Sequence, residues 1–159
     1  FATIAGFMGI GSLINSRLVQ RFGARRMSQS ALIGFCLIAA VHLALILMGW
    51  ETLVSFMTLQ ALTMLTVAFT ASNFSAISME PFHKGAGVAS SFQAFLTTAV
   101  SAALGSLVGR AFDGTTLPFT LGLLVFGTLS FLIVIWAERG KLFTRPNLAK
   151  LRDADMDFH

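Results

Sequence analysis

Polar side chains that could bind a small molecule are concentrated in one apolar segment, residues 52–77, which carries ten hydroxyl or amide side chains between Thr52 and Ser75. At 100° per residue, part of this set falls on one face of a helix. The polar members of that face are Ser55, Gln60, Thr63, Thr66, Thr70 and Asn73, and the apolar members are Phe56, Leu59, Val67 and Phe74. Such a mixed face favours a cavity for an amphipathic molecule, because apolar area supplies affinity and polar groups supply orientation.

The same residues have a second interpretation, in which they join neighbouring membrane helices. Small polar side chains are common between membrane helices, where one interhelical hydrogen bond contributes about 0.6 kcal/mol. Gln60 is the most informative residue, because an amide in the middle of a membrane needs several partners or water. The sequence leaves both interpretations open, and they differ in whether water reaches Thr63 and Thr66.

Two further polar residues stand out in the other apolar segments. Gln93 lies on one side of residues 87–110 together with three hydroxyl side chains. These are Ser90, Thr97 and Ser101. His42 lies inside the otherwise apolar residues 29–49, and no acidic residue stands near it in the sequence. We therefore expect His42 to be a neutral, hydrogen-bonded packing residue.

Enzyme chemistry is disfavoured by what these segments lack. No Asp or Glu lies inside them, and the spacings of metal ligands, of a nucleophile and its base, or of a phosphate-binding glycine loop are missing. The run from Asp153 to His159 has acidic residues at alternate positions, as some metal sites do, but a solvated chain end is the favoured interpretation. We expect neither a catalytic site nor a cofactor.

The composition indicates that these segments lie in a membrane. Of 159 residues, 55% are hydrophobic and only 11% are charged, whereas a soluble domain carries about 25% charged residues. A nucleic-acid partner and a disulfide-stapled secreted domain are disfavoured. The sequence predicts an all-α membrane protein with five spanning helices within residues 1–137 and a polar tail at 138–159. The expected helices cover about 1–20, 29–49, 52–77, 87–110 and 118–137.

The positive charges predict the orientation of these helices. Ten of the eleven basic residues fall on one side of the five-helix arrangement, and only Arg110 falls on the other. The ten are Arg17, Arg21, Arg25, Arg26, Lys84, Arg139, Lys141, Arg145, Lys150 and Arg152. Because basic loops stay in the cytoplasm, we expect a cytoplasmic C-terminus and an external Phe1. An external start without a signal sequence suggests that the chain is a piece of a longer protein.

Three stretches resemble one family. They read NSRLVQRFGARR from Asn15, NFSAISMEP from Asn73 with AGVASSFQ from Ala86, and AFDGTTLP from Ala111. All three resemble the Bcr/CflA drug-resistance branch of the major facilitator superfamily, and the similarity extends over about residues 6–140.

The resemblance implies half of a twelve-helix transporter in the bacterial inner membrane, energised by the proton gradient and exporting small amphipathic compounds. The five segments would be helices eight to twelve, the N-terminal half would be the missing partner, and that half would carry the proton-coupling carboxylates. The expected substrate-cavity residues are Phe56, Gln60, Thr63, Thr66, Thr70, Asn73 and Gln93. A non-transporting scaffold or assembly subunit is the alternative.

The resemblance also suggests a gating loop between the first two segments. Its expected members are Arg17, Arg21, Gly23, Arg25, Arg26 and Glu80. Gly23 is expected to end the first helix in the left-handed conformation, with Arg25 and Arg26 in the connection. Glu80 is the expected acidic partner of Arg21 or Arg25. The alternative is that the arginines only set the topology.

Overall fold

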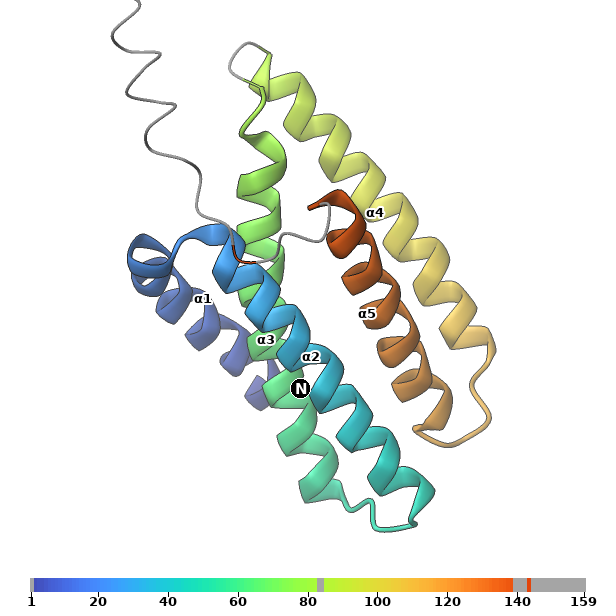
Figure 1. Ribbon diagram of the computed structural model, residues 1–159. Coiled ribbons are helices and arrows are strands. Elements are labelled where there is room, and N and C mark those ends of the chain that lie inside the picture. Colours follow the sequence, from blue (N-terminus) through green and yellow to red (C-terminus); the bar gives the residue numbers. More distant parts are fainter. Residues whose placement is uncertain (1, 83–84, 139–142, 144–159) are drawn as a thin grey trace, which may run out of the picture.

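The computed structural model describes residues 2–82, 85–138 and 143, and within them it is all helical (Figure 1). The five helices are α1 (Ala2–Phe22), α2 (Ala24–Leu47), α3 (Leu53–Met79), α4 (Ala86–Arg110) and α5 (Leu117–Ala137). The all-α class and the five helices expected from the sequence are therefore confirmed. The tail expected at 138–159 lies outside the described residues except for Glu138 and Phe143.

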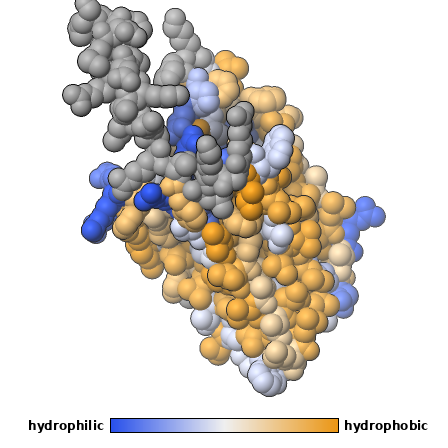
Figure 2. Space-filling model, in the orientation of Figure 1, coloured by the Kyte–Doolittle hydropathy of each residue, from blue (hydrophilic) through white to orange (hydrophobic). Residues whose placement is uncertain are grey.

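Four helices, α2 to α5, are long and apolar enough to cross a membrane. Hydrophobic residues accordingly cover most of the face seen in Figure 2, and the hydrophilic residues lie mainly at its margins. The helix α1 is not among the four, and its last two turns carry Asn15, Arg17 and Arg21. The structure thus indicates a multi-pass membrane protein, and four of the five expected spans are helices of sufficient length and apolarity.

The junction between α1 and α2 is shorter than the sequence suggested. Gly23 alone separates the two helices: its N–H donates to the carbonyl of Val19 at 2.8 Å, and its carbonyl accepts from Met27 at 3.2 Å. The expected left-handed conformation is wrong, because Gly23 has φ 84° and ψ 147°. The placement of Arg25 and Arg26 in a connection is wrong as well. One glycine with positive φ redirects the chain, and arginine, a good helix former, continues directly into α2.

The helix α3 packs against α1 and α2, and α2 also packs against α5. Glycine makes two of these contacts possible. A Cβ at Gly11 of α1 would lie 3.0 Å from Leu65 on α3, and a Cβ at Gly127 of α5 would lie 2.5 Å from the ring of Phe35 on α2. These positions therefore set how closely the helices approach.

The helix α4 lies to one side of this group and makes few contacts with α3 and α5 (Figure 1). None of its residues is buried. Gly105 and Gly109 have the GxxxG spacing that allows membrane helices to pack closely, but a Cβ added at either would meet no described residue within 4 Å. Apart from its few contacts with α3 and α5, the surface of α4 is thus open in the described part of the chain.

The connections lie at two ends of the bundle (Figure 1). One end of the bundle contains the end of α3, the start of α4 and the end of α5. Arg25, at the start of α2, contacts Glu80 and Glu138 at this end, and we call it the basic end. The other end holds the α2–α3 and α4–α5 connections, which touch through Glu51 and Thr116. Arg110 ends α4 at this second end, as the sequence suggested. Lys84 and the basic residues after Glu138 lie outside the described residues.

Candidate functional site

The polar face of α3 lies partly inside the helix group rather than along an open cavity. Gln60, Thr63 and Asn73 are 6%, 1% and 3% exposed, whereas Thr66 and Thr70 are half-buried. The cause is the packing of α1 and α2 against this helix. Three of the residues expected to face a substrate are therefore covered by neighbouring helices in the described part of the chain.

Asn73 makes the clearest interhelical contact of this face. Its Nδ2 donates to Oδ1 of Asn15 on α1 at 2.8 Å, and Nδ2 of Asn15 donates back to Oδ1 of Asn73 at 3.2 Å. Asn15 is only 5% exposed. This reciprocal pair is the helix-joining arrangement that the second interpretation describes, and it was not anticipated from the sequence, although both residues are amides in apolar segments.

The threonines of α3 bond to their own helix instead. The hydroxyls of Thr63, Thr66 and Thr70 donate to the carbonyls of Leu59, Thr63 and Thr66, each at 2.8 Å. These hydroxyls are satisfied without a neighbouring helix or a ligand, as is common for threonine in helices.

Gln60 differs from the threonines. Its Oε1 is buried and has no hydrogen-bond partner among the described residues. Leaving such an acceptor unsatisfied costs about 1–3 kcal/mol. Gln60 is therefore the one member of the polar face that calls for a further hydrogen-bond donor.

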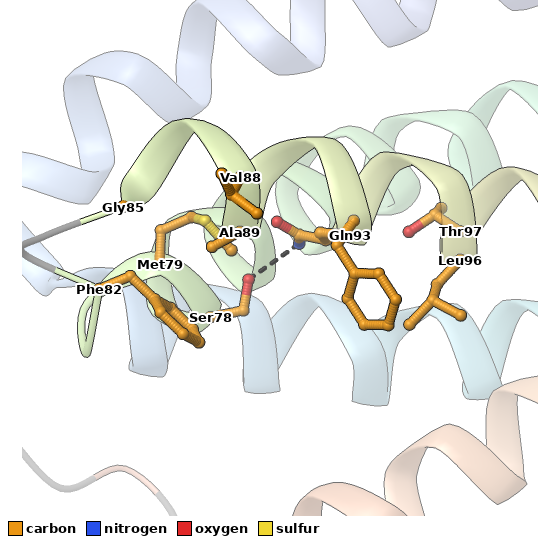
Figure 3. Close-up of a pocket in the computed structure, with 10 residues that line it drawn as sticks. Ser78, Met79, Phe82, Gly85, Val88, Ala89, Gln93, Leu96 and Thr97 are labelled. Atoms are coloured by element: carbon orange, nitrogen blue, oxygen red, sulfur yellow. Dashed lines mark hydrogen bonds between the residues drawn. The ribbon is translucent and has the colours of Figure 1, made fainter.

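Open grooves flank the pairing of α3 with α4. One forms a cavity of about 690 Å³ near the start of α4, lined by Met79, Phe82 and Phe92 among other apolar residues (Figure 3). Inside it, Nε2 of Gln93 donates to the hydroxyl of Ser78 at 2.8 Å. A second cavity of about 850 Å³ between the same helices is also lined by Gln93 and Ser78. Gln93 is thus the expected cavity residue that lines open cavities large enough for a small molecule.

Two other expected cavity residues lie elsewhere. Thr70 lines a smaller cavity of about 270 Å³, with Leu32 and Phe35 of α2 and Phe126 of α5. Phe56 meets the edge of the His42 ring, with 5.5 Å between the ring centroids. The expected set is therefore divided among several environments.

Arg25 joins three helices at the basic end. Its Nη2 lies 3.3 Å from Glu80, at the end of α3, and its Nη1 lies 3.2 Å from Glu138, which follows α5. The contact expected between Glu80 and Arg25 is thus present. Glu138 was missed because the sequence placed it in a solvated tail, yet its side chain is only 20% exposed, against 53% for Glu80. The three residues form what we call the basic-end cluster.

The neighbouring arginines have other partners. Nε of Arg26 donates to the carbonyl of Phe143 at 2.9 Å, and the N–H of Phe143 donates to Oε1 of the buried Gln29 at 2.7 Å. The guanidinium of Arg21 lies over the ring of Phe22 at 5.6 Å. Of the expected gating residues, only Arg25 and Glu80 are therefore brought together.

His42 has an acidic partner that the sequence did not reveal. Its Nε2 lies 2.9 Å from Oε1 of Glu51, and Oε2 of Glu51 accepts from the hydroxyl of Thr116 at 2.5 Å. Glu51 lies nine residues after His42 in the sequence, and the turn after α2 returns it over the last turns of that helix. Burial opposes the charge of Glu51, but the hydrogen bonds from Thr116 and His42 outweigh it and leave the pKa of Glu51 below its usual range.

Among the described residues no three His, Cys, Asp or Glu side chains gather as a metal site would require. The run from Asp153 to His159 lies outside those residues. Comparisons with protein-family models, with curated proteins and with solved structures each found no match to this chain. The fold, the charges and the side-chain geometry therefore carry the functional argument.

Proposed function

We propose that this chain is part of a proton-coupled multidrug efflux transporter that exports small amphipathic compounds by alternating access. In this proposal α1 to α5 are helices eight to twelve of a major facilitator fold. The helix α1 then also crosses the membrane, in addition to the four apolar helices α2 to α5. An N-terminal half of the same transporter covers the open flanks of α4. The proposed location is a bacterial inner membrane, as the family resemblance implies. The C-terminus is proposed to be cytoplasmic, because the described arginines gather mainly near one end.

The observation that carries this proposal is the cavity between α3 and α4. A volume of about 690 Å³ is within the range of small-molecule sites, about 300–1,000 Å³. Its wall joins aromatic and thioether surface from Phe82, Phe92 and Met79 to one amide, Gln93. Such a wall suits molecules with a large apolar body and few polar groups, since the apolar area supplies affinity and a single amide restricts orientation only loosely.

The basic-end cluster supplies a means of gating. Arg25 links α2 to the ends of α3 and α5 through partly exposed ion pairs, which contribute only about 0–1 kcal/mol each. Contacts of this strength break and re-form readily, as a reversible conformational change requires. In the proposed cycle Arg25 holds the basic end closed and releases Glu80 when the halves move.

A transport experiment tests the cavity assignment. Gln93→Ala in the full-length transporter should alter resistance to some exported compounds and not to others, while the amount of protein in the membrane is unchanged. Thr128→Ala is the matched control, because Thr128 is exposed on α5 and, among the described residues, its hydroxyl bonds only to the carbonyl of Leu124. Equal resistance to every compound in both variants would show that Gln93 does not face substrate. Gln60→Ala and Thr63→Ala test the buried part of α3 in the same assay.

A scaffold or assembly subunit remains a second candidate, favoured by one specific observation. Gln60, Thr63 and Asn73 are buried between helices, as residues that only hold helices together would be. Cysteine labelling in intact membranes separates the two candidates. A transporter predicts that water-soluble reagents reach Thr97, which lines the cavity, whereas a scaffold predicts that partner helices keep Thr97 unlabelled.

A further inference from the structure

A cavity of about 380 Å³ lies at the junction of α1 and α2, apart from the two cavities between α3 and α4. Its walls come from the last residue of α1, the first two turns of α2 and one residue that follows α5. These residues are Phe22, Arg26, Met27, Ser30 and Phe143. The cavity thus joins apolar surface to one guanidinium and one hydroxyl, a combination that suits a ligand with an anionic head and an apolar body.

The arginines beside this cavity are not neutralised by acidic side chains in the described part of the chain. The two acids described at the basic end, Glu80 and Glu138, both pair with Arg25. Within residues 2–82, 85–138 and 143, Arg21 and Arg26 form no ion pair. Their positive charges therefore attract an anion from outside these residues.

Both guanidinium groups adjoin the wall of the cavity. Arg26 lines it and donates through Nε to the carbonyl of Phe143 at 2.9 Å, which among the described residues is its only hydrogen bond. The guanidinium of Arg21 lies over the ring of Phe22, 5.6 Å from the ring centroid, and Phe22 belongs to the same wall. Two positive charges thus border one small cavity.

The cavity lies at the depth of the lipid head groups. The apolar run of α2 begins at Ala31, and Arg26 lies five residues before it. Five residues correspond to about 7 Å along a helix. The head-group layer on each side of the hydrocarbon core is about 5–7 Å thick. Arg26 therefore lies where the phosphates of one leaflet lie.

An exposed face of α2 continues from the cavity toward the middle of the span. Ser30, Leu37 and Val41 are exposed, the last two with 63% and 52% of their surface. Spacings of seven and four residues place them on one face of the helix, while other faces of α2 pack against α3 and α5. This face can hold an acyl chain, and a free phosphate would gain nothing from it.

We propose that the α1–α2 junction binds an anionic phospholipid, with its phosphate at Arg21 and Arg26 and one acyl chain along Ser30, Leu37 and Val41. Basic pockets at the ends of membrane helices bind the head groups of such lipids. Binding makes and breaks no covalent bond. The inference requires only that α2 crosses a membrane, so it is independent of the transporter proposal.

Native mass spectrometry of the full-length protein in detergent micelles tests this site. Phosphatidylglycerol and phosphatidylethanolamine with the same acyl chains are added in turn, because they differ in net charge and not in apolar surface. The first phosphatidylglycerol should bind at least about fivefold more tightly than the first phosphatidylethanolamine, since each basic residue near an anionic head contributes about that factor. An excess of glycerol phosphate should not displace it, because glycerol phosphate has no acyl chain.

Three variants locate the site. Arg26→Gln should weaken binding of phosphatidylglycerol about fivefold. Arg26→Lys keeps the positive charge but loses the Nε donor to Phe143, and it should stay within about twofold of the parent, which separates the charge from that contact. Arg110→Gln is the matched control, because Arg110 is an exposed arginine that ends α4 at the opposite end of the bundle, and it should also stay within about twofold.

A photoreactive phosphatidylglycerol locates the site without any variant. With one lipid bound per protein, a reactive group in its acyl chain should label mainly residues 30–41, as peptide mass spectrometry would show. This measurement decides the matter if Arg26→Gln does not fold.

Five results would overturn the inference. In the parent they are equal affinity for the two lipids, displacement of the lipid by glycerol phosphate, and labels that lie mainly on other helices. In the variants they are binding that survives Arg26→Gln, and binding that Arg26→Lys or Arg110→Gln weakens as much as Arg26→Gln does.

Discussion

The pair of buried asparagines between α1 and α3 allows a quantitative prediction. Asn15 and Asn73 exchange two hydrogen bonds, at 3.2 and 2.8 Å, and both side chains are about 95% or more enclosed, with 5% and 3% exposed. Replacing either with leucine keeps the approximate volume and leaves the other amide without its partner. Replacing both removes the two amides together.

The magnitudes follow from general values for buried polar groups. A single substitution should lower the free energy of unfolding by about 1–3 kcal/mol, because it strands one buried amide. The coupling free energy between the two positions contains two interhelical hydrogen bonds of about 0.6 kcal/mol each and the penalty for the amide that a single substitution leaves unpaired. Together these give a coupling of about 1–2 kcal/mol. Asn15→Leu with Asn73→Leu should therefore cost about 1–2 kcal/mol less than the sum of the single changes.

Reversible unfolding in mixed micelles measures these differences. The helical signal of the purified protein is followed as denaturing detergent is added, for the parent, both single variants and the double variant. Costs that add to within about 0.5 kcal/mol would refute the reasoning, since residues in direct contact do not behave independently. Such a result would mean that α1 and α3 are not held together at this pair.

Other predictions concern packing, the basic end and acid. Gly127→Ala places a Cβ 2.5 Å from a ring carbon on α2 and should cost about 1–3 kcal/mol in thermal unfolding, whereas Gly105→Ala, in open space, should stay within about 0.5 kcal/mol. Glu80→Gln should slow turnover at unchanged protein level, and Glu138→Gln, at the less exposed ion pair, should slow it more, as initial transport rates would show. The lowered pKa of Glu51 stabilises the fold above the ordinary carboxyl pKa. That contribution should disappear as the pH falls below about 4. Glu51→Gln should then show a flatter melting profile against acid pH, and an identical profile would contradict the assignment.

The lengths of the apolar segments made the helices predictable from the sequence. Apart from the start of α2, every boundary agrees with expectation to within two residues, because apolar runs of this length have few alternatives in a membrane. The start of α2 was missed because Arg25 and Arg26 were assigned to a loop on account of their charge. Charge predicts which side of a membrane a segment occupies, but helix continuation depends on the backbone, and only Gly23 interrupts it.

The candidate sites were less predictable because they depend on which helices meet. Helical periodicity placed the polar residues of α3 on one face, but periodicity does not say which helices cover that face. In the structure α1 and α2 pack against α3, and Gln60, Thr63 and Asn73 are buried. The partner of His42 comes from the turn that follows its own helix. To predict Glu138 as a partner of Arg25, one would have to know that the end of α5 meets the start of α2.

Proton exchange driven by substrate tests the proposed function most directly. The full-length protein is placed in inside-out vesicles whose interior is acidified, and a pH-sensitive dye reports the gradient. Addition of a cationic amphipathic dye such as ethidium should release protons from the interior, and Gln93→Ala should reduce this release for some compounds and not for others. If no member of a panel of cationic, neutral and zwitterionic amphipathic compounds discharges the gradient beyond protein-free vesicles, the chain does not belong to a drug/proton antiporter.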